Sequence, residues 1–242
     1  MNIEIRECVS FEDLAACVQL QREVFALPDI EISPVRHLIV TKNAGGFTLG
    51  AFVDGSLIGF VISVPAFLYG QRAVYSHMTA VKVEFQSFGV GAKLKWAQRE
   101  RALKDGIGFI KWTFQPVQSR NAFFNLEKLG AVIKHYEPNF YGTDYPDPES
   151  GLGLDSDRLF AEWELSSPKA VALASGQPFN EESAVKREIV VPTNWDELVR
   201  DDLATAVAEQ QRMKSEFMES FAEGLVCRGF IRDDSRPRYL LF

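Results

Sequence analysis

Cysteine is scarce in this chain, and the thiols that it has stand far apart. The three cysteines are Cys8, Cys17 and Cys227. A disulfide framework needs more cysteines than this, and a zinc site needs Cys and His residues at short, regular spacings. The sequence therefore predicts free thiols that are buried as small apolar side chains.

Positive charge is also in short supply. Lys and Arg number 26 against 33 Asp and Glu, which gives a net charge of −7. This balance leaves no basic footprint for a nucleic acid or an anionic membrane surface, so we expect neither partner. No apolar run approaches the roughly 20 residues of a membrane span, and the first residues lack the charged and apolar regions of a signal peptide. We expect a cytoplasmic protein.

The composition shows no excess of the residues that keep chains disordered. Hydrophobic residues make up 46% and charged residues 24% of the 242 positions. These are ordinary values for a globular protein, and the length allows one domain with a sizeable core plus an addition. We find no internal repeat.

Hydrophobic periodicity predicts a mixed succession of helices and strands over the first two thirds of the chain. Ser10 is expected to cap a first helix and Ser33, followed by Pro34, a second. Asp54-Gly55 is typical of a tight hairpin turn. The expected strands are 3–6, 47–53, 56–67, 75–83, 107–114, 131–136 and 159–165, and the later helices are 89–104 and 119–129.

A glycine turn between the expected strand 75–83 and the expected helix 89–104 is the most informative motif. Its sequence is Gln86-Ser87-Phe88-Gly89-Val90-Gly91. Glycine lets the backbone approach an anion, and the first N–H groups of a helix point at that anion with the positive end of the helix dipole. The context therefore predicts a cradle for a pyrophosphate group.

Two well-known phosphate loops do not fit this turn. A Walker loop needs Gly-Lys followed by Ser or Thr, whereas Gly91 is followed by Ala92 and Lys93. The dinucleotide fingerprint needs a third glycine where Leu94 stands. What remains is the pattern Gln-x-x-Gly-x-Gly.

This pattern resembles the acyl-CoA pyrophosphate motif of the GNAT (Gcn5-related N-acetyltransferase) superfamily, and the order of elements over residues 1 to 166 is similar to the GNAT order. A second piece, Arg120-Asn121-Ala122 through Glu127-Lys128-Leu129-Gly130, is similar to the family's Asn-x-x-Ala…Tyr-Glu-Lys-x-Gly helix. The chain looks like a little-characterised subgroup of predicted acetyltransferases. The resemblance implies an α+β fold with a mixed, mostly antiparallel central sheet flanked by helices.

The resemblance also implies which residues meet the cofactor, an acetyl-CoA or another acyl-CoA, with no metal. The backbones of Val81 and Val83 would pair with the pantetheine amides, and the backbone N–H groups of the glycine turn would hold the pyrophosphate. The turn residues are Gln86, Ser87, Phe88, Gly89, Val90 and Gly91. The family's asparagine position falls on Ser119, which leaves its neighbour Asn121 as the candidate.

The catalytic residues are less clear, because the tyrosine that protonates the departing thiolate in the family falls on Leu126. Tyr141 is the first substitute and Tyr136 the reserve, although a phenol packed on the core is an alternative for Tyr141. His77 is the candidate base, since its unperturbed pKa near 6.5 suits deprotonation of an ammonium. A structural role for this histidine stays open, and His37 has no motif context.

After residue 166 the composition changes to Ser, Ala, Pro and Gly without periodicity, which indicates a linker over about 167–185. Beyond it we expect a strand at 189–191, one long helix opened by Asn194 and Glu197 as a capping box, and a strand pair at 225–231 and 239–242. The sequence thus predicts a GNAT domain at 1–166 and a small α/β extension at 167–242. The long helix is expected to pack on the core or on a second copy, as in a homodimer, with a lid over the acceptor site as the alternative.

The leading functional hypothesis is an N-acyltransferase that moves an acetyl or succinyl-type group from acyl-CoA to an amine of a small metabolite. The alternative is a CoA-binding module without catalysis, with a regulatory or assembly role. The absent tyrosine and the displaced asparagine favour this alternative more than the full family pattern would.

Overall fold

The computed structural model describes residues 2–25, 28–147 and 152–242, and the chain divides into two compact units. Unit 1 comprises Met1–Lys111 and Glu164–Ser166, and unit 2 comprises Trp112–Trp163 and Ser167–Phe242. Unit 2 therefore combines the segment that follows the glycine-turn helix with the C-terminal extension.

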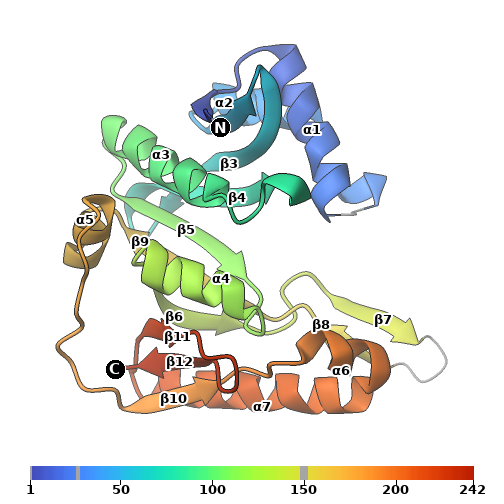
Figure 1. Cartoon of the computed structure of the whole chain (residues 1–242), viewed down its shortest axis with the longest axis vertical. Helices are drawn as coiled ribbons and strands as arrows, with labels where there is room; N and C mark the ends of the chain where they lie inside the picture. The colour runs from blue at the N-terminus through green and yellow to red at the C-terminus, as the bar shows by residue number, and fades with distance from the viewer. Residues whose placement is uncertain (1, 26–27, 148–151) are drawn as a thin grey trace. The chain divides into compact units, whose positions relative to one another are not determined.

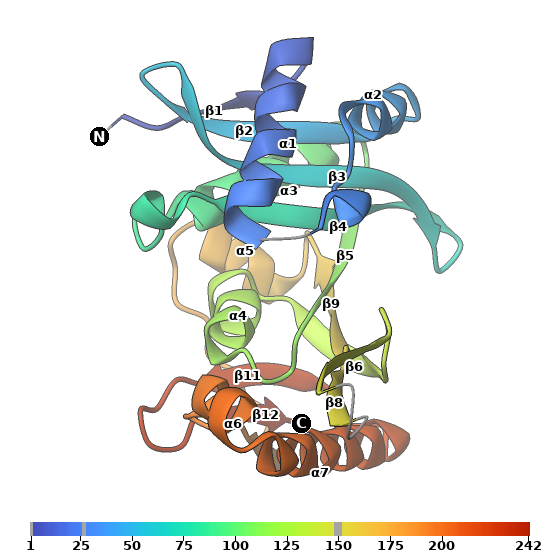
Figure 2. The same cartoon turned by 90° about the vertical axis from the view of Figure 1, so that its right-hand side faces the viewer.

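Unit 1 is a sheet with helices on both faces (Figures 1 and 2). Its strands are β1 (Glu4–Glu7), β2 (Phe47–Val53), β3 (Ser56–Leu68), β4 (Gln71–Val81) and the first half of β5 (Phe109–Phe114), in that order across the sheet. Its helices are α1 (Phe11–Phe25), α2 (Val35–Asn43) and α3 (Val90–Lys104), with 3₁₀ turns η1 (Asp29–Glu31) and η2 (Val83–Phe85). Strands β1 to β4 are antiparallel, and β4 pairs with β5 in parallel at Val74–Ile110 and Tyr75–Lys111.

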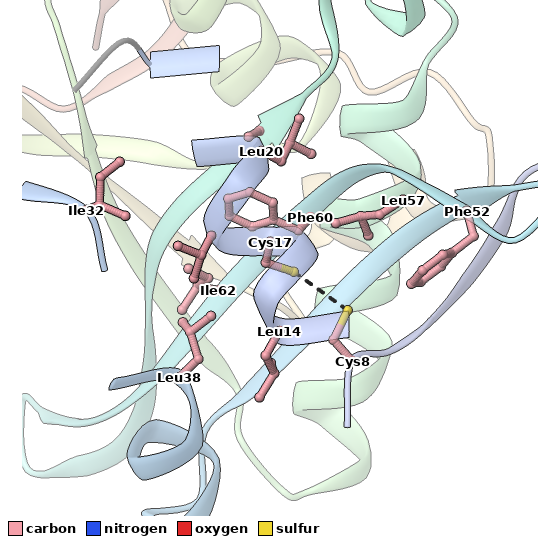
Figure 3. Close-up of a cluster of buried hydrophobic side chains, with 12 residues drawn as sticks. Cys8, Leu14, Cys17, Leu20, Ile32, Leu38, Phe52, Leu57, Phe60 and Ile62 are labelled. Atoms are coloured by element: carbon pink, nitrogen blue, oxygen red, sulfur yellow. Dashed lines mark hydrogen bonds between the residues drawn. The ribbon is translucent and has the colours of Figure 1, made fainter. Parts of the chain in front are cut away.

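The core of unit 1 lies between α1, α2 and the sheet (Figure 3). Leu14, Leu38, Phe60 and Ile62 are buried there with exposures of 2% or less. Cys17 also lies in this cluster, with its Sγ 3.8 Å from the Sγ of Cys8. The three cysteines, Cys227 of unit 2 included, are free and buried, as the sequence predicts.

Unit 2 carries a second run of antiparallel strands. The order is β9 (Arg158–Glu164), β6 (Val132–Glu137), β11 (Cys227–Ile231), β12 (Arg238–Leu241) and β10 (Arg187–Val190), and β7 (Thr143–Asp147) pairs separately with β8 (Leu152–Asp155). The helices are α4 (Ser119–Phe123), continued by the π turn η3 (Phe124–Lys128), then α5 (Pro168–Ala174), α6 (Trp195–Asp201) and α7 (Leu203–Ala222). Figure 1 shows α7 running beside β10, and Phe217 of α7 stacks on Tyr136 with ring centroids 5.7 Å apart. The apolar stripe of α7 therefore packs on the sheet of its own unit.

The Asp54-Gly55 hairpin is confirmed, because both residues have the positive φ angles, 48° and 78°, of a two-residue turn. The predicted strand 75–83 is longer at its start and shorter at its end. Lys82 N–H still bonds to Ile58 O, but Phe85 N–H then turns back to Lys82 O. Val83 therefore lies in a 3₁₀ turn and not on the strand.

Two predicted caps differ from the structure. The N-cap of α2 is Pro34, and Ser33 precedes the helix with its backbone bonded to Gln21 and its Oγ 3.3 Å from His77 Nε2. The long C-terminal helix is broken at Asp202, whose φ of −147° is extended and whose carboxylate accepts from Thr205 N. Asn194 makes no side-chain cap bond, so the predicted capping box is wrong.

The predicted linker after residue 166 contains a helix. Ser167 Oγ accepts from Ala170 N at 3.3 Å, and Pro168 occupies the first turn of α5. A serine cap followed by proline is a strong start signal for a helix, and here it outweighs the loop-like composition that follows. The β7–β8 hairpin was not predicted from the sequence either.

Candidate functional site

The glycine turn connects β4 to α3 through two residues in the left-handed backbone region, one of which is a serine. Ser87 and Gly89 both adopt positive φ angles, 72° and 76°. Gln86 folds its side chain back, so that Nε2 donates to Val81 O at 3.1 Å and fixes the turn to the end of the strand. Val90, 1% exposed, anchors the start of α3 in the core.

The first turn of α3 has backbone N–H groups that the helix itself does not bond. Among the described residues, the first bond of the helix ladder runs from Lys93 N to Gly89 O, which leaves the N–H groups of residues 89 to 92 without intrahelical acceptors. A Cβ atom built on Gly91 meets no atom within 4 Å. Four N–H groups at the positive end of a 15-residue helix, with room for a Cβ at Gly91, fit a pyrophosphate.

The edge of β4 beside this turn is open over its last residues. In the described residues, parallel pairing with β5 involves Val74 and Tyr75 only, so Val81 is paired through its β3 edge. A strand edge with free N–H and C=O groups can pair with the amides of an extended ligand such as pantetheine. The Val81 carbonyl already accepts from Gln86 Nε2, so Val81 could make that contact only through its N–H, whereas Val83, 72% exposed in η2, has no strand edge to offer.

His77 occupies a β-bulge in β4. The register passes from Ile62–Met78 to Ser63–Ser76, so His77 has no partner residue on β3. A bulge redirects side chains, and bulges are frequent beside active sites. His77 turns toward the α1–α2 connection, where its Nε2 is 3.3 Å from Ser33 Oγ.

The environment of His77 keeps its imidazole neutral. Burial lowers its pKa from the ordinary value of 6.5, and the nearby His37 ring, 6.4 Å away between centroids, lowers it further. Ser33 is held in place because Gln21 Oε1 accepts from Ser33 N at 2.9 Å and Gln21 Nε2 donates to Ser33 O at 3.2 Å. Sequence reasoning missed Ser33, Gln21 and His37, because only the fold brings them to a strand some 40 residues away.

The opposite face of β4 carries a buried polar network. Lys95 of α3 donates from Nζ to Gln98 Oε1 at 2.7 Å and to Ser76 Oγ at 3.1 Å, while Gln98 Nε2 donates to Ser63 Oγ at 2.8 Å. Lys95 is 3% exposed, and burial lowers its pKa to about 7. The network ties α3 to β3 and β4 at the bulge.

The helix that resembles the family's second motif belongs to unit 2, and its key position is apolar. Leu126 is fully buried within the π turn η3, so this position presents no proton donor to a ligand. Glu127 Oε1 accepts from Phe230 N at 2.8 Å and thereby holds β11. Asn121 is exposed on α4.

The two candidate tyrosines of unit 2 differ in environment. Tyr141 is 61% exposed, with the Arg158 guanidinium 4.9 Å from its ring centroid. Tyr136 is 5% exposed and donates to Asp157 Oδ2 at 2.5 Å. Burial and this carboxylate raise the pKa of Tyr136 well above 10, which makes it the poorer proton donor.

The structure thus gathers His77, Val81 and the glycine turn in unit 1, while Asn121 and Tyr141 belong to unit 2. Within the described ranges, no group of three or more His, Cys, Asp and Glu side chains is placed to hold a metal ion. In the same ranges, no helix is both long and apolar enough to cross a membrane.

Comparisons with known proteins identify the fold. No protein-family model matches the chain, and no curated protein sequence matches it. Among solved structures, an N-acetyltransferase from Staphylococcus aureus is 15% identical with a TM-score of 0.56, over 69% of this chain and 100% of that one. An acetyltransferase of the GNAT family from Desulfovibrio desulfuricans is 14% identical with a TM-score of 0.55, over 68% of this chain and 100% of that one.

A third solved structure contains acetyl-CoA. It is a GNAT family acetyltransferase from Elizabethkingia anophelis with acetyl-CoA bound, which is 19% identical with a TM-score of 0.51, over 68% of this chain and 99% of that one. The chain therefore has the GNAT fold, a mixed α/β arrangement with a mostly antiparallel sheet.

Proposed function

We propose that the chain is an N-acyltransferase that moves an acetyl or related acyl group from acyl-CoA to the amine of a small metabolite. The observation that carries this proposal is the glycine turn, whose N–H groups from Gly89 to Ala92 have no intrahelical acceptor and no Cβ above Gly91. Bound there, acyl-CoA supplies the thioester that the reaction breaks. The turn and the last residues of β4 hold and orient the cofactor.

His77 is proposed as the base. In the reaction the amine nitrogen forms a bond to the thioester carbonyl carbon, the C–S bond breaks, the nitrogen loses a proton and the thiolate gains one. A neutral imidazole accepts that proton, and the lowered pKa keeps His77 in this form at pH 7. Ser33 orients the ring through its contact with Nε2. Tyr141 is proposed as the donor to the thiolate, because its hydroxyl belongs to an exposed side chain.

Thiol release from acetyl- and succinyl-CoA, measured against a panel of small amines, tests the transfer. We expect His77→Gln to lower kcat/KM by roughly 10² or more, the usual contribution of a general base. The acid limb of the pH profile should lie below pH 6.5, since rate is lost as His77 becomes protonated. His135→Gln is the matched control, because His135 is an exposed histidine of unit 2 paired with Glu137. An unchanged kcat/KM in His77→Gln removes His77 from the mechanism.

A CoA-binding module without catalysis is the second candidate, and the burial of Leu126 favours it. Calorimetry distinguishes the two. Binding of CoA without thiol release for any amine supports the module, and no binding of any CoA thioester at high micromolar concentration contradicts both.

A further inference from the structure

The bulge at His77 separates two pairs of residues that β3 and β4 form in different registers. Met78 pairs with Ile62, which we call the apolar pair, and Ser76 pairs with Ser63, which we call the serine pair. His77 is the extra residue of β4 between them. Residues that are paired across an antiparallel ladder have their side chains on one face, and successive residues of a strand alternate between faces. The two pairs therefore lie on opposite faces of the sheet.

The contacts of each pair identify its face. Ile62 belongs to the core cluster beneath α1 and α2, and Met78 packs against that cluster (Figure 3). The serine pair lies on the α3 face, because Gln98 of α3 bonds both hydroxyls. In an unbroken ladder that kept the apolar pair, Ser63 would stand opposite His77, and the imidazole would lie on the α3 face. The bulge is therefore what turns His77 to the other side of the sheet.

The side-chain amide of Gln98 bonds both serines at once. Its Nε2 donates to Ser63 Oγ at 2.8 Å and to Ser76 Oγ at 3.1 Å. Gln98 and Ser63 are fully buried and Ser76 nearly so, which leaves little water to replace a lost partner. If His77 stood opposite Ser63, the amide would lose its second hydroxyl and an imidazole would have to fit in place of a serine. The amide therefore stabilises the bulged register.

Lys95 fixes the orientation of this amide. Its Nζ donates to Gln98 Oε1 at 2.7 Å and to Ser76 Oγ at 3.1 Å. The amide oxygen of Gln98 thus faces the lysine, and its two N–H bonds face the two serines. Because each polar atom of the Gln98 side chain is bonded, the network is rigid and specifies one arrangement of the strands beneath it.

We propose that Gln98 is a positioning residue for His77. By holding the serine pair on the α3 face, it fixes the bulge that turns the imidazole toward Ser33 on the opposite face. Gln98 acts through the strand and contacts neither the acyl group nor the amine. The inference deepens the proposed function and rests on it in so far as His77 is the base, whereas control of the imidazole's orientation does not depend on that function.

NMR of the histidine rings tests the proposal in Gln98→Met, which keeps an unbranched side chain but has no N–H donor. The chain has three histidines, and the loss of one ring signal in His77→Gln assigns His77. The rings of His37 and His77 lie 6.4 Å apart between centroids, so both signals should shift in Gln98→Met as the rings separate. The signal of His135, exposed in unit 2, should stay in place.

Thiol release gives a second measurement. The kcat of Gln98→Met should fall about tenfold or more, because a base that is displaced by about 1 Å loses much of its effect. The KM for acyl-CoA should stay the same, since Gln98 lies about two helical turns beyond the glycine turn. Gln210→Met is the matched control, because Gln210 is a buried glutamine of unit 2 that makes two bonds to the Asp155 backbone. It should leave the signals of His37 and His77 unchanged.

Unchanged signals of His37 and His77 in a folded Gln98→Met overturn the proposal, and so do equal shifts in Gln210→Met. A fall in kcat without a shift of the His77 signal overturns it as well. If Gln98→Met fails to fold, Ser63→Ala replaces it, because this variant removes one hydroxyl of the serine pair and leaves both bonds of Lys95 in place. The same two signals should then shift. Shifted signals in a protein that releases no thiol support the positioning role and contradict only the transferase function.

Discussion

Gly91 has room for a side chain, but a side chain there would occupy the proposed pyrophosphate site. Gly91→Ala meets no atom within 4 Å and removes a flexible residue from the first turn of α3, so we expect an equal or higher melting temperature. The added methyl group would stand where we propose that the pyrophosphate binds, so the Kd for CoA should rise about tenfold or more.

Gly108→Ala is the matched control, because its Cβ also meets nothing within 4 Å. Calorimetry with CoA and thermal melting of both variants form the test. An unchanged CoA affinity in Gly91→Ala places the pyrophosphate elsewhere.

Lys95 makes the stability of unit 1 depend on pH. Its folded pKa of about 7 lies below the 10.5 of an exposed lysine, so from pH 7 upward the unfolded chain binds the extra proton. The free energy of unfolding therefore rises with pH in this window. Between pH 7 and 8.5 the expected gain from Lys95 is up to about 2 kcal/mol, and the unfolded thiols, which begin to titrate in this range, affect the parent and a Lys95 variant alike.

Lys95→Met removes this group and should flatten the rise. Urea unfolding of the parent and the variant at intervals between pH 7 and 8.5 measures it. A variant whose unfolding free energy rises as steeply as the parent's shows that Lys95 remains charged in the folded protein. Lys93→Met is the control, because Lys93 is exposed on the same helix.

At the scale of elements, the π turn η3 buries position 126 and so determines whether a side chain there can donate a proton to a ligand. Leu126 is fully buried, so Leu126→Tyr would not restore the family's acid but would overpack the core, at a cost of about 1–3 kcal/mol of stability. Leu126→Met, which nearly conserves volume, should cost less than about 1.5 kcal/mol. Thermal melting and thiol release of both variants test whether a tyrosine at position 126 can act as a proton donor. A gain of turnover in Leu126→Tyr would show that it can.

Several elements could be predicted from the sequence because local residue preferences determine them. The Asp54-Gly55 turn and the buried strands around it were predicted from a dipeptide and an apolar pattern. The same Ser-Pro signal capped α5 at Ser167 but not α2 at Ser33, whose Oγ lies against His77 of β4 and whose N–H bonds to Gln21 of α1. Such tertiary contacts are invisible in the local sequence.

The candidate site could likewise be predicted only where its residues are contiguous in the sequence. The glycine turn could be predicted because its motif is contiguous, whereas the surroundings of His77 could not. The bulge that turns His77 toward Ser33 arises from the register between β3 and β4, and no residue type marks it. The break at Asp202 is similar, since an acidic residue is also common inside exposed helices.

At the scale of the whole molecule, the C-terminal extension is part of the core of unit 2 rather than an appendage. Phe217 of α7 stacks on Tyr136 and meets Tyr239 edge to face, with centroids 5.0 Å apart. The Tyr239 hydroxyl donates to Pro116 O at 2.7 Å. The extension therefore completes a core that residues 112–163 begin.

This arrangement predicts that a chain ending at Ser166 does not fold its second unit. Removal of the extension exposes Tyr136 and leaves Ile133 without its β11 partner Cys227. The fragment should therefore bind a dye that recognises exposed apolar surface, and its second unit should no longer melt cooperatively. Cleavage of the full-length protein within the exposed segment 177–184 is the control, because both pieces keep their contacts and should elute together in size-exclusion chromatography. A fragment 1–166 that melts cooperatively without binding the dye would show instead that the GNAT portion folds alone, with the extension as a separable addition.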